Sequence, residues 1–197
     1  MNQNLEKKEK PRLPPGQHLT NRFPILQKGK IPEVDITNYV LEFDGEVENP
    51  MKFTLKDLKR IQDKKILADI HCVTSWSKYD TKWGGISFNK LFELINPKPT
   101  ANYVEFYCAD DGFTTTVPIE KLQEKNSILA LTYDGMPITN KHGGPVRPII
   151  PSLYFYKSAK WVRRITFLKE DRLGYWEKAG YSNKADPWKE QRYSYQD

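Results

Sequence analysis

Cys72 is the residue of this sequence with the clearest capacity for chemistry. It follows an alternating apolar segment, residues 66–70, which predicts a strand that ends at His71 and Cys72. A thiolate is both a soft metal donor and a nucleophile, so a cysteine at a strand end can ligate a metal or attack a substrate. The alternative is a small, buried apolar residue. Because successive strand residues point to opposite faces, His71 is a poor base for Cys72, and nucleophilic chemistry would need a base such as His142.

A second candidate site combines glycines with basic residues after position 140. Gly143 and Gly144 would let the backbone approach a ligand closely, between His142 and Arg147. The positive side chains that follow are Lys157, Lys160, Arg163 and Arg164. Together these groups have enough positive charge to bind a phosphate. The alternative is a Gly-Pro loop followed by a solvated basic strand.

Composition narrows the class of protein. The chain has 197 residues, of which 38% are hydrophobic and 28% charged, as is typical of a soluble globular protein with one core. No apolar run approaches the roughly 20 residues that a membrane helix needs. Residues 1–17 carry neither an apolar export segment nor a twin arginine, so we expect a cytoplasmic location.

The net charge and the two cysteines do not by themselves identify a function. The net charge of +6 fits nucleic acid, a phosphorylated cofactor or no specific partner. After Lys169 the chain is rich in aromatic residues, but its charges are mixed, which disfavours nucleic-acid binding. Cys72 and Cys108 are too few for a disulfide framework, and the cysteines and histidines lack a zinc-site spacing.

Short elements must position these residues. We expect a flexible tail at residues 1–17, and then one domain, residues 18–197, with an irregular N-terminal arm that wraps onto it and an aromatic C-terminal segment. Helices are predicted to start after Thr54, Ser87 and Pro118. Strands are predicted at 39–44, 66–72, 102–108, 113–117, 128–133, 149–156 and 161–168, with long loops at 73–85 and 136–148. This pattern predicts an α+β fold, a mixed β-sheet with short surrounding helices.

Four segments taken together resemble one family. They are residues 69–77 around Cys72, 110–115, the Gly-Pro-Arg loop 142–147, and the Lys-x-x-Lys-Trp segment 157–161. In order and spacing they resemble the sulfite oxidase-type molybdopterin oxidoreductases, across roughly residues 23–192. The arm at 22–24 and the ending at 174–188 are similar to the compact, single-domain prokaryotic members.

The resemblance implies a cofactor and its ligands. It implies the sulfite oxidase-type molybdopterin-binding fold, which holds one molybdenum bound by one pterin dithiolene, with Cys72 as the thiolate ligand of the metal. Residues implied to bind the pterin and its phosphate are His142, Arg147, Lys157, Ser158 and Lys160. The arm residues Asn21, Phe23 and Pro24 would cover the cofactor, and Cys108 would lie beside it. Trp76 and Tyr79, with Trp83, would line the substrate pocket next to the metal.

The implied activity is two-electron oxo transfer on a small molecule, with electrons exchanged with a separate redox partner. Sulfite oxidases carry paired arginines that hold sulfite where this chain has Trp76 and Ser77. The methionine sulfoxide reductase branch carries glutamate where this chain has Thr74. The predicted reaction is therefore S-oxide or N-oxide reduction or a sulfite-like oxidation. A pterin-binding carrier without catalysis is the alternative function, and the oligomeric state stays open.

Overall fold

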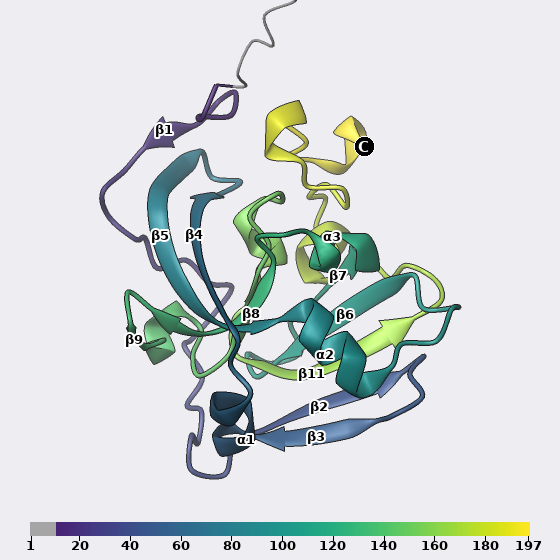
Figure 1. Cartoon of the computed structure of the whole chain (residues 1–197). Helices are drawn as coiled ribbons and strands as arrows, with labels where there is room; N and C mark the ends of the chain where they lie inside the picture. The colour runs from purple at the N-terminus through teal and green to yellow at the C-terminus, as the bar shows by residue number, and fades with distance from the viewer. Residues whose placement is uncertain (1–10) are drawn as a thin grey trace, which may run out of the picture.

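Two mixed β-sheets form the framework of the computed structural model, which describes residues 11–197 (Figure 1). The first sheet consists of β1 (His18–Leu19), β4 (Lys64–His71), β5 (Trp76–Ser87), β8 (Ile128–Tyr133), β9 (Met136–Pro137) and β10 (Arg147–Ile149). The second consists of β2 (Val40–Gly45), β3 (Met51–Thr54), β6 (Tyr103–Cys108), β7 (Thr114–Pro118) and β11 (Val162–Leu168). The mixed sheets agree with the predicted fold class.

Strand β5 organises the first sheet. It pairs with β4 and β8 in antiparallel fashion and with the short β1 in parallel. The second sheet has the order β3-β2-β11-β6-β7, in which only β2 and β11 run parallel. Because β4 and β5 are joined by the short turn at 72–75, this hairpin places Cys72 at one end of the first sheet.

The helices are short and lie around the sheets. The α-helices are α1 (Leu55–Arg60), α2 (Phe88–Ile95), α3 (Ile119–Gln123) and α4 (Tyr175–Lys178), and the 3₁₀ helices are η1 (Asn140–His142), η2 (Phe155–Lys157), η3 (Pro187–Lys189) and η4 (Ser194–Gln196). Thr54 and Asp57 form the capping box of α1, and Ser87 caps α2. Within the described part of the chain, no helix is long and apolar enough to cross a membrane.

The buried residues form two hydrophobic clusters. Leu41 and Phe43 alternate with more exposed residues along β2, as the sequence predicts, and belong to the larger cluster with Cys108. The smaller cluster lies against the first sheet and contains Cys72, Trp76 and neighbouring apolar side chains. The two cysteines therefore belong to different clusters.

Two sequence predictions of local structure were wrong. The predicted loop at 73–85 is mostly strand β5, and its Gly85 packs so closely on β8 that an added Cβ would lie 2.0 Å from the Leu129 carbonyl oxygen. The glycines that suggested a loop thus serve strand packing. The predicted strand at 149–156 is strand only at Ile149, since Pro151 has no amide donor and η2 follows.

The N-terminal segment also differs from the expectation. Residues 1–10 of the predicted flexible tail lie outside the described residues. Residues 11–17 contact the body of the protein. The Arg12 guanidinium donates to the carboxylates of Asp69 and Asp80, at 2.7 and 2.5 Å, and the Gln17 side chain reaches the end of β4. The part of the expected tail that the structure describes is therefore held against the body of the protein.

Candidate cofactor and active site

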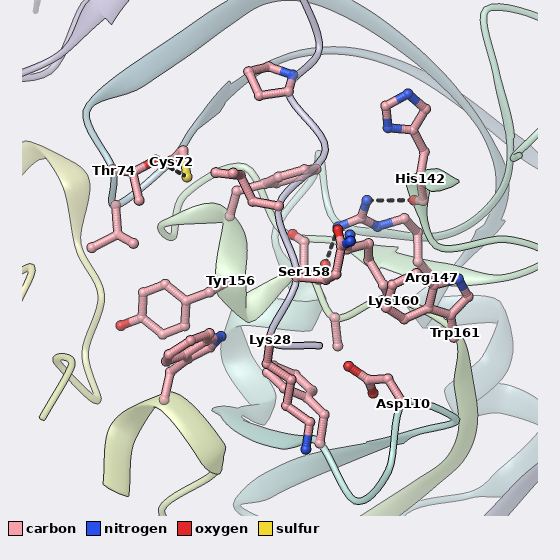
Figure 2. A pocket seen from close by; sticks show the side chains of 18 of the residues that line it. Lys28, Cys72, Thr74, Asp110, His142, Arg147, Tyr156, Ser158, Lys160 and Trp161 are labelled. Atoms are coloured by element: carbon pink, nitrogen blue, oxygen red, sulfur yellow. Dashed lines mark hydrogen bonds between the residues drawn. The ribbon is translucent and has the colours of Figure 1, made fainter. Parts of the chain in front are cut away.

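A cavity of about 270 Å³ lies where the end of β4, the N-terminal arm and the segment before β11 meet (Figure 2). Eight of the predicted site residues line it: Phe23, Pro24, Cys72, Trp76, His142, Arg147, Ser158 and Lys160. Segments far apart in the sequence thus converge on one site. Figure 2 shows Cys72 and Thr74 on one side of this cavity and His142, Arg147, Lys160 and Asp110 on the other.

The first side, which we name the cysteine wall, comprises Cys72, Thr74 and Trp76. The Cys72 amide donates to the Trp76 carbonyl at 2.8 Å, and the Ser75 amide donates to the Cys72 carbonyl at 3.0 Å, so a tight turn fixes the cysteine. Its Sγ lies 3.1 Å from the Thr74 hydroxyl oxygen. Burial raises the pKa of the Cys72 thiol, and the Thr74 hydrogen bond opposes this rise.

Side chains from both ends of the described chain hold this turn. The Gln17 amide donates to the Cys72 carbonyl at 3.0 Å and accepts from the Ser77 hydroxyl at 3.2 Å. The Arg192 guanidinium donates to the Val73 carbonyl at 2.5 Å and to the Gly16 carbonyl at 3.0 Å. Sequence analysis missed Gln17 and Arg192, because no local pattern signals a contact across such separations.

The opposite side, which we name the cation wall, comprises His142, Arg147, Lys160 and Asp110. Arg147 is 2% exposed and donates to the backbone carbonyls of His142, at 2.8 Å, and Ser158. Its Nε is buried with no hydrogen-bond partner among the described residues. Burial lowers the pKa of Arg147 to about 9.

Lys160 and Asp110 carry opposing charges on the same wall. Burial, followed by the charge of Arg147, lowers the pKa of Lys160 to about 8. Burial raises the pKa of Asp110 to about 6, while Lys28 and Lys160 oppose that rise. One carboxylate among these cations leaves a positive excess that an anionic ligand would neutralise.

The two glycines of the loop at 140–147 have a different role from the predicted one. An added Cβ at Gly143 would lie 2.5 Å from the Lys160 side chain, and one at Gly144 would lie 2.0 Å from the Ile138 carbonyl oxygen. They let the loop pack on its own protein neighbours. This close packing in turn positions His142 and Lys160 on one wall.

The two histidines near the site, His142 and His71, lie in different environments. His142 stacks on Phe23 of the arm, with ring centroids 4.1 Å apart, so the arm covers the cavity. His71 is buried with its Nδ1 2.8 Å from the Ser77 hydroxyl oxygen, and burial lowers its pKa to about 4. Its ring also packs edge-on against Trp188, away from the Cys72–Thr74 contact. This arrangement agrees with the expectation that His71 and Cys72 point to different faces.

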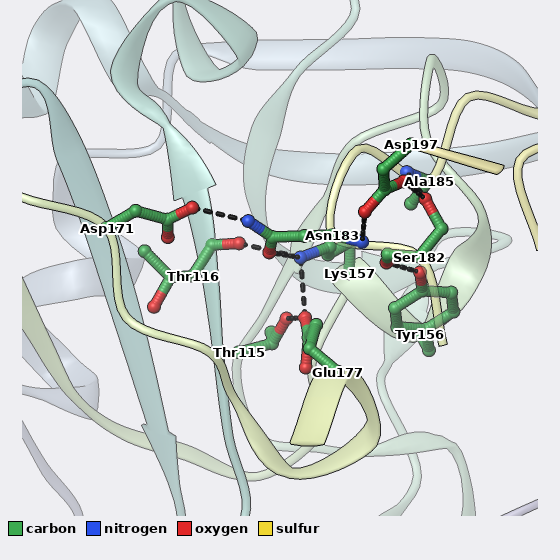
Figure 3. A network of polar contacts seen from close by, with 10 residues as sticks. All are labelled: Thr115, Thr116, Tyr156, Lys157, Asp171, Glu177, Ser182, Asn183, Ala185 and Asp197. Atoms are coloured by element: carbon green, nitrogen blue, oxygen red, sulfur yellow. Dashed lines mark hydrogen bonds and ion pairs between the residues drawn. The ribbon is translucent and has the colours of Figure 1, made fainter. Parts of the chain in front are cut away.

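The structure places the Lys157 side chain outside this cavity. Lys157 is fully buried, and its ammonium donates to the Glu177 carboxylate at 2.5 Å and to the Thr116 carbonyl at 2.9 Å (Figure 3). A buried ammonium needs such partners, so its charge is already compensated. The Lys157 side chain therefore lies off the cavity lining, whereas the resemblance implied that it binds the pterin.

Four other expected residues also lie off the cavity lining. Cys108 is 1% exposed in the larger core, and Trp83 donates its Nε1–H to the Thr81 hydroxyl. The Tyr79 ring lies under the Arg12 guanidinium at 4.1 Å. Asn21 is exposed, and its carbonyl accepts from the Lys78 ammonium at 2.9 Å. The predicted aromatic wall is formed instead by Trp76 with residues that sequence analysis missed, namely Phe155, Tyr156, Trp176 and Tyr181.

Comparison with known proteins accounts for this combination of a thiol and a cation wall. Residues 28–176 match the oxidoreductase molybdopterin binding domain. The chain belongs to this family. It is 40% identical over 185 residues to the "Uncharacterized oxidoreductase YuiH" of Bacillus subtilis (strain 168), with 93% of each protein covered. The chain is therefore a molybdopterin-binding oxidoreductase of the sulfite oxidase family.

More distant family members are larger proteins. The chain is 26% identical to the sulfite oxidase of Arabidopsis thaliana, covering 78% of this chain and 48% of that protein. It is 25% identical to the protein-methionine-sulfoxide reductase catalytic subunit MsrP of Campylobacter jejuni, covering 71% and 52%. The fold matches the sulfane dehydrogenase SoxCD of Paracoccus pantotrophus with a TM-score of 0.65 at 23% identity, covering 71% of this chain and 40% of that chain. The chain thus spans about half of these three proteins.

The residues present fit the molybdenum cofactor that the family implies. A thiol suits a soft metal centre, and the unpartnered Arg147 Nε suits an anionic oxygen on the same ligand. The buried Trp76 Nε1 also has no acceptor among the described residues. A group with a metal at one end and a phosphate at the other would therefore meet complementary walls.

Proposed function

We propose that this protein is a molybdenum-dependent oxidoreductase in which Cys72 ligates the metal. The observation that carries the proposal is that Cys72 and the cation wall line the same cavity. The bound cofactor would supply two-electron oxo transfer, exchanging an oxygen atom with a substrate heteroatom. The protein's part is to hold, orient and enclose it.

The two walls would divide this work. Arg147 and Lys160 would bind the pterin phosphate, with Ser158 beside them, because they are the charged donors that line the cavity without full compensation. Phe23 would keep water from the cofactor through its stack on His142. Cys72 would present its sulfur from a turn that backbone hydrogen bonds keep in place.

The surroundings of Cys72 favour an uncharged oxide as the substrate. Thr74, Trp76, Tyr156, Trp176 and Tyr181 line the cavity near the cysteine wall, and none of them carries a charge. We propose reduction of an S-oxide or N-oxide, in which the oxide takes up two electrons and two protons and releases water. The Trp76 Nε1–H is a free donor that could hold the oxide oxygen. Sulfite, an anion, would find no charged side chain among these lining residues.

The first test is the molybdenum and pterin content of protein from a molybdate-supplied host that makes the cofactor. We expect near-stoichiometric molybdenum, the fluorescence of oxidised pterin on denaturation, and turnover of dimethyl sulfoxide or trimethylamine N-oxide with reduced methyl viologen. Pterin without turnover of oxides or sulfite would indicate the carrier function. Absence of both, with a related enzyme properly loaded in that host, would contradict the proposal.

A further inference from the structure

A run of packed aromatic rings leads from the cavity to the protein surface. Tyr181 lines the cavity and contacts Trp176 and Tyr156, with ring centroids 5.4 and 5.6 Å away. On its other side Tyr181 stacks on Tyr193 at 5.8 Å, and Tyr193 stacks on Tyr195 at 5.7 Å. We name Tyr181, Tyr193 and Tyr195 the tyrosine stack.

The geometry of the stack is regular. The two stacked pairs have interplanar angles of 14° and 15°, so all three rings lie nearly parallel. The exposed fraction rises outward, from the half-buried Tyr181 to 45% at Tyr193 and 82% at Tyr195. The outermost ring therefore offers solvent a flat face that continues the same stack.

Hydrogen bonds hold the stack to the body of the protein. Tyr181 and Tyr193 form an antiparallel β-bridge, and the Gln196 side chain accepts from the Tyr193 amide at 2.9 Å. The Asp197 carboxylate accepts from the Ser182 hydroxyl and from the Asn183 amide, the latter at 2.8 Å (Figure 3). The backbone that carries Tyr181 and Tyr193 is thus held to the cavity wall, as a route between cavity and surface requires.

We propose that the tyrosine stack is the electron-exchange route of this enzyme, and that Tyr195 is the docking point for an acidic flavoprotein. This inference rests on the proposed function, because oxide reduction consumes two electrons that a donor must supply. An isoalloxazine ring is flat and can extend a stack of parallel rings. The net charge of +6 favours an acidic partner.

Electrons balance over two docking events. Each event would oxidise one flavin hydroquinone to the semiquinone and supply one electron for oxide reduction in the cavity, and solvent would supply the two protons that leave as water with the oxide oxygen. The tyrosines are not oxidised in this scheme. Their packed rings replace solvent along the path, which improves electronic coupling between the partner and the cavity.

The test compares two electron donors on the same loaded enzyme. Reduced methyl viologen is small enough to approach the cavity directly, whereas reduced flavodoxin, an acidic flavoprotein, can only dock outside it. We expect Tyr195→Leu and Tyr193→Leu to lower flavodoxin-linked turnover at least about fivefold, the effect of truncating an aromatic residue central to an interface. Viologen-linked turnover should not change. Tyr195→Phe should behave as wild type, because the ring and not the hydroxyl carries the proposal.

Tyr107 provides a matched control, and ¹⁹F signals of labelled tyrosines provide a second readout. Tyr107→Leu removes an aromatic residue of 44% exposure from β6, outside the stack, and should alter neither turnover. In protein labelled with fluorotyrosine, oxidised flavodoxin should shift the ¹⁹F signals of Tyr193 and Tyr195 and leave that of Tyr107 in place, whether or not turnover occurs.

Each failure can be attributed to one proposal. Lack of molybdenum, or lack of viologen-linked turnover, would contradict the proposed function. Normal viologen-linked turnover without flavodoxin-linked turnover in wild type, equal flavodoxin rates in the Tyr195→Leu variant and wild type, or unmoved ¹⁹F signals would each overturn the electron route alone.

Discussion

The cysteine wall and the cation wall face the same cavity but are built by opposite means. The cysteine wall has no charged side chain of its own, and the side chains of Gln17 and Arg192 hold its turn from outside by donating to the backbone carbonyls of Cys72 and Val73. The cation wall carries its charges inward, with Arg147 buried and one of its donors left unpartnered. The cation wall therefore buries a charged donor without a partner among the described residues, whereas the unpartnered Trp76 Nε1–H of the cysteine wall is neutral.

This difference indicates that the cysteine wall is the reactive end of the cavity and that the cation wall is the end that binds an anion. Burying an uncompensated charge costs free energy unless a ligand neutralises it, so the cation wall is expected to gain stability from an anion. The cysteine wall gains nothing comparable from an anion. Substitutions in the cysteine wall should therefore lower turnover, whereas substitutions in the cation wall should lower the cofactor content.

The largest effect is expected for Cys72→Ser. The hydroxyl is a harder and much less acidic donor than the thiol, so turnover should fall by more than the roughly 10–100-fold typical of residues behind a metal ligand. Cofactor content should change little, because the cation wall is intact. Dye-linked turnover and molybdenum content, measured on one sample, check both statements.

Cys108→Ser is the matched control for that substitution. Cys108 is 1% exposed in the other core and does not line the cavity. It should keep its cofactor, and its turnover per bound molybdenum should stay near that of wild type. If Cys72→Ser retained full turnover per molybdenum, the assignment of Cys72 as the metal ligand would be abandoned.

Lys160→Met should give the opposite pattern. Loss of a hydrogen bond from a charged group, about 1.5–3 kcal/mol, corresponds to a roughly 10–100-fold weaker hold on the cofactor. The fold should tolerate the change, because burial already disfavours the charged amine. Molybdenum content should fall with little loss of thermal stability of the cofactor-free protein, while turnover per remaining molybdenum is retained. Loss of turnover at full cofactor content would contradict this division of the walls.

How far the sequence predicted the fold depends on the range of the interactions involved. Alternation along β2 and the caps at Thr54 and Ser87 are local, and these elements form as predicted. Strand β5 escaped prediction because Gly84 and Gly85 usually interrupt strands, and only their contact with β8 shows why glycine is needed there.

The candidate site shows the same limit. Cys72, Arg147 and Lys160 were found because their residue types and spacing resemble a family pattern, and all three line the cavity. The pattern could not indicate that the Lys157 ammonium pairs with the carboxylate of Glu177, which lies 20 residues further along the chain. Nor could it identify Gln17 and Arg192, whose roles depend on contacts 55 and 119 residues away.

Arg192→Met should have a smaller effect, on the cysteine wall. It removes the donors to the Val73 and Gly16 carbonyls and leaves the thiol in place. Turnover should fall about tenfold with cofactor retained, as for a residue that orients a metal ligand. Hydrogen–deuterium exchange should rise in peptides covering residues 70–77. Arg172→Met, which removes an exposed arginine whose guanidinium lies 3.9 Å from the Glu105 carboxylate, is the control and should change neither measurement.

The smallest effect concerns pH and belongs to the cation wall alone. Burial lowers the pKa of Lys160 to about 8, so its amine loses its charge as the pH rises through 8. Sulfate is a suitable probe, since it stays a dianion over this range. Its affinity for cofactor-free protein should therefore fall above pH 8, by about three- to tenfold, the difference between a charged and a neutral donor. Lys160→Met should abolish that step.

Asp110 adds a second step in the same direction. Burial raises the pKa of Asp110 to about 6, so the carboxyl is neutral below that pH and repels sulfate only above it. Below the pKa of Arg147, sulfate should bind most tightly under pH 6 and weaken once near 6 and again near 8. Asp110→Asn should remove the first step and keep the second, and Cys72→Ser should keep both. A sulfate affinity that depends on the cysteine wall, or that rises with pH, would show that the two walls do not act separately.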